Sequence, residues 1–157
     1  MELPYENAKR ITFKRRKVPI SPENRPIVKM AQLTLVLYLA SRGYSANIYK
    51  LQLFNWVFKS NDRDQIIYGV IQDPQINIPF INMDPTVNRA LQFAVADKLI
   101  SFSASTGKFI LLDRGIEFAK SIILVKEAFV EEKNFLNSLG KKVTDKIVSV
   151  IFKERKL

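Results

Sequence analysis

The stretch from Asp84 to Gly115 constrains the fold most, because it combines a helix, a tight hairpin and the start of another helix. Asp84 and Pro85 predict a helix start, since aspartate caps a first turn and proline fits its first position. Apolar residues then recur every three or four positions and predict one buried stripe, formed by Val87, Ala90, Leu91, Ala94, Val95 and Leu99. Two β-rich runs, "LISFSAS" and "GKFILL", follow around a turn at Gly107. This order is typical of a recognition helix followed by a wing.

Further helices are predicted on both sides of this stretch. Upstream, a dense apolar helix begins at about Pro26 and is ended by Gly43, and Ser45 is the expected N-cap of a second helix. The segment "DRDQIIYGVIQD" predicts a short third helix, and "PQINIPFINM" a loop or a short edge strand. Downstream, Asp113 is the expected cap of a long helix that ends near Gly140, and "VTDKIVSVIFKERKL" predicts a last helix.

These elements together predict a mainly α fold. Its core is a winged helix-turn-helix with one short β-hairpin as the wing and with flanking C-terminal helices. We divide the chain into a basic N-terminal arm at 1–25, a winged-helix domain at 26–123, and a C-terminal helical extension at 124–157.

The net charge of +10 favours an anionic partner, but the charge is unevenly distributed. Residues 1–31 hold 8 Lys and Arg against 3 Asp and Glu, or +5, whereas residues 61–100 hold 3 against 5, or −2. The expected recognition helix therefore lies in acidic sequence. Its outward positions are Thr86, Asn88, Arg89, Gln92, Asp97 and Lys98. One Arg and one Lys supply little charge for phosphates, so an interaction platform is favoured, and base readout by this helix stays open.

The basic run near the N-terminus is the better electrostatic candidate for nucleic acid. A basic arm can follow phosphates without sequence preference and become ordered on binding. Two alternatives stay open, namely a solubilising tail and an arm that docks on an acidic partner. The candidate nucleic-acid-binding residues are Arg10, Lys14, Arg15, Arg16 and Lys17.

Aromatic residues are the candidates for a protein contact. The second helix is rich in aromatics on more than one face, and the C-terminal helices carry more apolar residues than one small core needs. Packing on a partner or on a second copy would cover them, while burial in the core is the alternative. The candidate partner-binding residues are Trp56, Phe58, Phe129 and Phe135.

The composition removes most catalytic chemistry. Without His or Cys the chain has no zinc or thiol site and no Ser–His pair, and it contains no glycine-rich phosphate loop. We therefore expect no enzyme, no metal and no cofactor; a small nuclease would have to use Asp62, Asp64 and Asp73. The N-terminus lacks an apolar signal region and no apolar run could span a bilayer, so a cytoplasmic protein without a membrane partner is expected.

A family resemblance covers about residues 28–123. It rests on Phe80 with Asp84 and Pro85, on "NRAL" from Asn88 to Leu91, and on "LLDRGIEFA" after the wing. This pattern resembles the small middle component of bacterial ABC-three-component systems, the group that includes the small subunit of Lamassu-type anti-phage defence.

The resemblance implies a non-catalytic accessory subunit beside an SMC/Rad50-like ATPase and an effector subunit, often a nuclease. It implies no catalytic residues. Asp84 would cap its helix, while Asn88 and Arg89 would bond to neighbouring loops. The basic arm lies outside the resemblance, and in the role that we favour it would help the complex to engage DNA. The alternative is a winged-helix transcriptional regulator that dimerises through its C-terminal helices.

Overall fold

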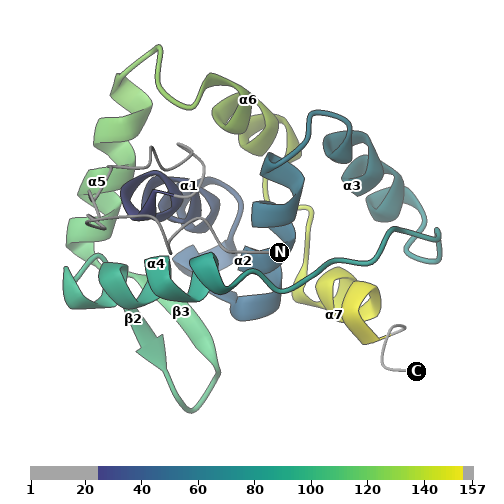
Figure 1. The fold of residues 1–157 in the computed structure, drawn as a ribbon, viewed down its shortest axis with the longest axis horizontal. Helices are drawn as coiled ribbons and strands as arrows, with labels where there is room; N and C mark the ends of the chain where they lie inside the picture. Colours follow the sequence, from purple (N-terminus) through teal and green to yellow (C-terminus); the bar gives the residue numbers. More distant parts are fainter. Residues whose placement is uncertain (1–24, 154–157) are drawn as a thin grey trace, which may run out of the picture.

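A computed structural model of the chain describes residues 25–153 (Figure 1). Within this range, helices and a small sheet alternate along the sequence. The helices are α1 (Pro26–Leu39), α2 (Ile48–Phe58), α3 (Arg63–Gln72), α4 (Pro85–Ala96), α5 (Asp113–Leu124), α6 (Val130–Leu139) and α7 (Asp145–Lys153), with a short 3₁₀ turn, η3 (Arg42–Tyr44). The strands are β1 (Ser45–Asn47), β2 (Ile100–Ser103) and β3 (Lys108–Leu111). The described part is thus mainly helical, as predicted.

The three strands form one antiparallel sheet in the order β1–β3–β2. The hairpin of β2 and β3 was predicted, whereas β1 was not. Ser45 is the first residue of β1 and pairs with Ile110, so its prediction as an N-cap was wrong. Asn47 caps α2 instead, because its side chain accepts a hydrogen bond from Lys50 N at 2.9 Å. Residues 45–47 are extended because they pair with β3, which is distant in the sequence.

Helices α1 and α2 form the centre of the molecule. Every α1 residue from Lys29 to Leu37 is buried, and so is every α2 residue from Lys50 to Val57. Helices α4, α5 and α6 contact α1, while α3 and α7 contact α2 (Figure 1). Leu136 of α6 and Ile151 of α7 belong to the same buried cluster as the central helices. The C-terminal helices therefore complete the chain's own core.

The long helix predicted from Asp113 is two helices, α5 and α6. Phe129 lies between them with a left-handed φ of 52°. Lys133 stabilises the break, because its ammonium donates to the Val125 carbonyl at 2.6 Å, beside the end of α5. Asp113 is the first residue of α5 rather than its cap, since the cap position is Leu112 and makes no side-chain bond. The break lets α6 turn and bury its own apolar face on α1.

The apolar stripe predicted on α4 is largely confirmed. Four of its residues, Val87, Ala90, Leu91 and Ala94, are buried, and so is Leu99 beyond the helix end. Val95 was predicted to be buried and is 40 % exposed, and Phe93 is 48 % exposed. Helix α4 therefore carries apolar side chains on its outer surface as well as on its inner one. None of the helices within residues 25–153 is long and apolar enough to cross a membrane.

Candidate functional site

The start of α4 is fixed by Asp84. One carboxylate oxygen accepts hydrogen bonds from the Thr86 backbone N at 2.9 Å and the Thr86 hydroxyl at 2.7 Å. The main chain of Asp84 also exchanges two hydrogen bonds with the Gln52 side chain, at 2.8 and 3.0 Å. The predicted helix cap is thus confirmed, and Gln52 attaches that cap to α2.

Two lysines and an asparagine complete the surroundings of the Asp84 carboxylate. Its other oxygen accepts from Lys59 Nζ at 2.7 Å and from Asn55 Nδ2 at 3.1 Å. Lys29 of α1 is buried, lies 3.6 Å from the same oxygen and donates to Asn55 Oδ1 at 2.5 Å. Burial alone would raise the pKa of Asp84, but the hydrogen bonds from Lys59, Thr86 and Asn55 outweigh it and hold the pKa well below its usual value. Asp84 is therefore a charged anchor that joins α1, α2 and α4.

The outer side of this anchored helix forms a groove with the hairpin. The groove has a volume of about 390 Å³. Phe102 and Phe109 are cross-strand partners with ring centroids 4.9 Å apart, and Phe102 is 53 % exposed. No charged side chain is among the groove's lining residues, which are Asn88, Leu91, Gln92, Val95, Phe102 and Phe109. The outer side of α4, where base readout stayed open, thus carries an apolar groove whose lining includes the amides of Asn88 and Gln92. We call it the α4–hairpin groove.

The charged residues among the outward positions, Arg89, Asp97 and Lys98, lie outside this groove. Arg89 is exposed on α4 but does not line the groove. The expectation that Asn88 and Arg89 bond to neighbouring loops was wrong, because both are exposed and neither side chain makes a hydrogen bond to another described residue. Lys108 precedes Phe109 in β3, and successive strand residues point to opposite faces of a sheet. The only lysine of the hairpin therefore points away from the groove.

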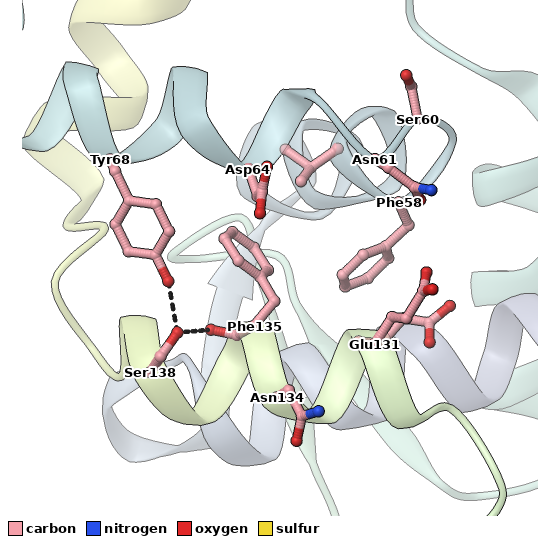
Figure 2. A pocket seen from close by; sticks show the side chains of 11 residues that line it. Phe58, Ser60, Asn61, Asp64, Tyr68, Glu131, Asn134, Phe135 and Ser138 are labelled. Carbon is pink, nitrogen blue, oxygen red and sulfur yellow. Dashed lines mark hydrogen bonds between the residues drawn. The ribbon is translucent and has the colours of Figure 1, made fainter.

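A larger cleft of about 610 Å³ lies between α2, α3 and α6 (Figure 2). The rings of Phe58 and Phe135 project into it from facing elements, and the Tyr68 hydroxyl contacts that of Ser138 at one end. Three carboxylates also line the cleft, from Asp64, Glu131 and Glu132. This cleft therefore unites aromatic and acidic side chains.

The four candidate partner-binding aromatics are thus only partly brought together. Phe58 and Phe135 share the cleft, but Trp56 is only 8 % exposed. The guanidinium of Arg63 covers the Trp56 ring at 4.4 Å and donates to the Trp56 carbonyl at 2.7 Å. Phe129 is half-buried at the break before α6. Trp56 is therefore covered by its own chain, and Phe129 lies apart from the cleft.

The predicted nucleic-acid residues Arg10, Lys14, Arg15, Arg16 and Lys17 lie outside the described residues.

The carboxylates considered for a nuclease are not clustered. Asp62 precedes α3 and Asp73 follows it, so this helix of 10 residues separates them by about 15 Å. Between residues 25 and 153, no group of three or more Asp or Glu could hold a metal ion.

The order of elements is the remaining clue to the class of protein. The winged-helix order here is α1, β1, α2, α4 and then the hairpin β2–β3. It is interrupted once, because α3 and residues 73–84 lie between α2 and α4. A mainly helical domain with a three-stranded antiparallel sheet of this order is compatible with a winged-helix type of fold. Comparison of the chain with family models, curated proteins and solved structures found no match.

Proposed function

We propose that the chain is a winged-helix accessory subunit of an SMC/Rad50-like ATPase complex in anti-phage defence. In this role it is non-catalytic, bridges the ATPase and an effector such as a nuclease, and assists DNA engagement through its basic arm. The α4–hairpin groove is the surface that docks on a protein partner. The observation that carries the proposal is the chemistry of this groove.

The groove favours protein over DNA for an electrostatic reason. A helix that reads bases also needs cations around it, because phosphate contacts supply most of the affinity for DNA. The six residues that line the groove carry no charge, and Phe102 and Val95 expose apolar surface to solvent. Exposed aromatic surface that is edged by amides is typical of the centre of a protein interface. The partner surface that fits is apolar, with hydrogen-bonding groups that match Asn88 and Gln92.

The support for the larger assembly comes from the sequence. The "DP", "NRAL" and "LLDRG" elements resemble the small middle component of ABC-three-component systems. In the structure, "DP" begins α4, "NRAL" forms its first turns, and "LLDRG" links β3 to α5. Two residues of "NRAL", Asn88 and Leu91, thus line the docking surface, and "DP" begins the helix that carries them. A subunit whose motifs maintain a docking helix suits an assembly role better than a catalytic one.

The proposal is tested by co-expressing the chain with an SMC/Rad50-like ATPase encoded in the same operon. We expect the two proteins to purify together. Phe102→Asp combined with Val95→Asp should abolish the association, because two charges would have to be desolvated in the contact. The matched control is Leu124→Asp with Val125→Asp, which introduces the same two charges at side chains that are 81 % and 50 % exposed and lie outside the groove. It should leave the complex intact.

Three results would contradict the proposal. The first is an operon without such an ATPase, and the second is a groove variant that still purifies with it. The third is sequence-specific DNA binding that Arg89→Ala weakens by about 1–3 kcal/mol at one base position only. That third result would favour the alternative, a winged-helix transcriptional regulator.

A further inference from the structure

A basic pocket lies on the other side of the hairpin. It occupies about 280 Å³ between η3, β1, the start of β3 and the segment that leads into α7. Five cationic side chains and one carboxylate, that of Asp145, line it. The cationic residues are Arg42, Lys50, Lys108, Lys141 and Lys146. We call it the basic pocket, and it differs in chemistry from both the α4–hairpin groove and the acidic cleft.

Strand register explains why this pocket and the groove are separate. Ser45 pairs with Ile110 and Asn47 pairs with Lys108, so Ser45 and Lys108 share one face of the sheet. Phe109 lies between these positions in β3 and points to the opposite face, into the groove. One short hairpin therefore presents an apolar surface on one side and a cationic surface on the other.

The most informative member of the pocket is Lys50. Its side chain is buried, with the residue only 4 % exposed, and its ammonium donates to the Ala40 carbonyl at 2.7 Å. An ammonium has three donors, and this is the one hydrogen bond that Lys50 Nζ makes within residues 25–153. Burial chiefly lowers the pKa of Lys50 to about 8; Asp145 opposes this effect, and Lys108 and Arg42 add to it. The buried cation is thus under-compensated by the chain itself.

We infer that the basic pocket binds a phosphate group, presented by a nucleic-acid backbone or by a phosphorylated small molecule. The five cations supply the charge, and Arg42 adds a planar fork that suits phosphate oxygens. The volume is several times the roughly 30 Å³ that one water occupies, so a phosphate with ordered waters fits. The N-terminal end of α7 also borders the pocket through Thr144, Asp145 and Lys146, and the positive end of the helix dipole favours an anion there.

Asp145 regulates the strength of this site. It is the only carboxylate in the lining, and it forms an ion pair with Lys108 at 2.9 Å. A bound phosphate would compete with Asp145 for Lys108 and would be repelled by its charge. Loss of this carboxylate should therefore strengthen binding. This inference is independent of partner docking through the α4–hairpin groove.

The test uses the full chain, so that any contribution of the basic arm is the same in all variants. The pocket variant is Arg42→Gln with Lys146→Gln, both exposed positions. Its matched control is Lys120→Gln with Lys126→Gln, which removes the same charge from exposed positions outside the pocket. One arm measures binding of a short DNA duplex by fluorescence anisotropy at several salt concentrations. The other titrates inorganic phosphate and follows the backbone amide shifts of Asp145 and Lys146 by NMR.

We expect the pocket variant to weaken duplex binding on the order of 10-fold and to reduce the salt slope by about 1–2, while the control stays within about 2-fold. Asp145→Asn should tighten binding by about 3-fold, in line with loss of one repulsive charge. A response of the phosphate arm alone, removed by the pocket variant, would assign the site to a phosphorylated small molecule. The inference would be overturned if the pocket variant and the control variant changed binding equally in both arms. It would also be overturned if the wild type bound neither the duplex nor phosphate.

Discussion

Replacement of Asp84 by Asn tests how the start of α4 is held. The amide keeps the shape of the side chain and an oxygen for the Thr86 cap, but it removes the negative charge that faces Lys29. The Lys29 side chain is only 3 % exposed and its ammonium lies 3.6 Å from the carboxylate. Removing one partner of a buried ion pair costs about 3–5 kcal/mol, whereas an exposed pair is worth about 0–1 kcal/mol. Lys59 is 39 % exposed, so its pair with Asp84 contributes little. We expect Asp84→Asn to cost about 3 kcal/mol of unfolding free energy.

Urea unfolding of four proteins separates this charge effect from the helix cap. The proteins are the wild type, Asp84→Asn, Lys29→Met, and the double variant. The double variant buries neither charge. We therefore expect its loss of unfolding free energy to be about 2 kcal/mol smaller than the sum of the losses in the two single variants. Asp84→Ala should cost about 1 kcal/mol more than Asp84→Asn, since it also removes the cap.

The same network predicts a pH dependence. The folded-state pKa of Asp84 lies below its usual value of 3.8, so the carboxylate stabilises the fold at pH values above that usual value. This stabilisation is lost as the pH falls below it toward the folded-state pKa. The difference in stability between wild type and Asp84→Asn should therefore be constant near neutral pH and should shrink below about pH 4. A cost under about 1 kcal/mol, a zero coupling with Lys29, or a difference that does not change with pH would refute this reasoning.

Three further changes test other parts of the structure. The buried ammonium of Lys50 destabilises the fold when it is charged, and its folded-state pKa is about 8. The unfolding free energy of the wild type, relative to that of Lys50→Met, should therefore rise by about 2–3 kcal/mol between about pH 7 and pH 10 in denaturant unfolding. A difference that stays constant with pH would contradict the burial of a charged lysine. Gly115→Ala should lower the unfolding free energy by more than about 3 kcal/mol, because an added Cβ would lie 2.1 Å from the Leu99 carbonyl oxygen. Gly69→Ala is its control: the added Cβ would meet only Ile76 Cδ1 at 3.4 Å, so a stability change within about 1 kcal/mol is expected in thermal melts. Lys133→Met should loosen the turn between α5 and α6 and speed amide exchange there, since it removes the bond to the Val125 carbonyl; unchanged exchange would show that the turn does not need it.

Local signals in the sequence were sufficient for several elements. The Asp84–Pro85 start, the spacing of Val87, Ala90 and Leu91, and the turn at Gly107 each act within a few residues of where they stand. The structure has α4 and the hairpin at these positions. Such features are predictable because both partners of each interaction lie within a few residues of each other in the sequence.

Features that depend on distant partners were missed. Strand β1 has three residues and exists because β3 pairs with it, more than 60 positions away. The break between α5 and α6 places Phe129 in a left-handed conformation, although no glycine or proline marks it. The exposure of Val95 was missed because its spacing fits the apolar stripe of α4. The helix buries the side that holds Ala90, Leu91 and Ala94, and Val95 lies beside that buried side.

One missed feature did leave a signal. Gln52, Asn55 and Lys59 recur at spacings of three and four in and just after the largely apolar second helix. Such spacing places them on one face, and polar groups on a buried helix require partners. That partner is Asp84, which contacts all three. The sequence could have indicated a buried polar contact on α2, though not which residue would fill it.

Photo-crosslinking from position 102 tests the central claim most directly. The residue is aromatic and 53 % exposed at the mouth of the α4–hairpin groove, so a benzophenone amino acid can replace Phe102 with little disturbance. Irradiation in cells that express the whole operon should yield an adduct with a protein, the SMC/Rad50-like ATPase or the effector. The same probe at exposed Lys120, outside the groove, should yield none. An adduct with DNA from position 102, and none with protein, would contradict the account.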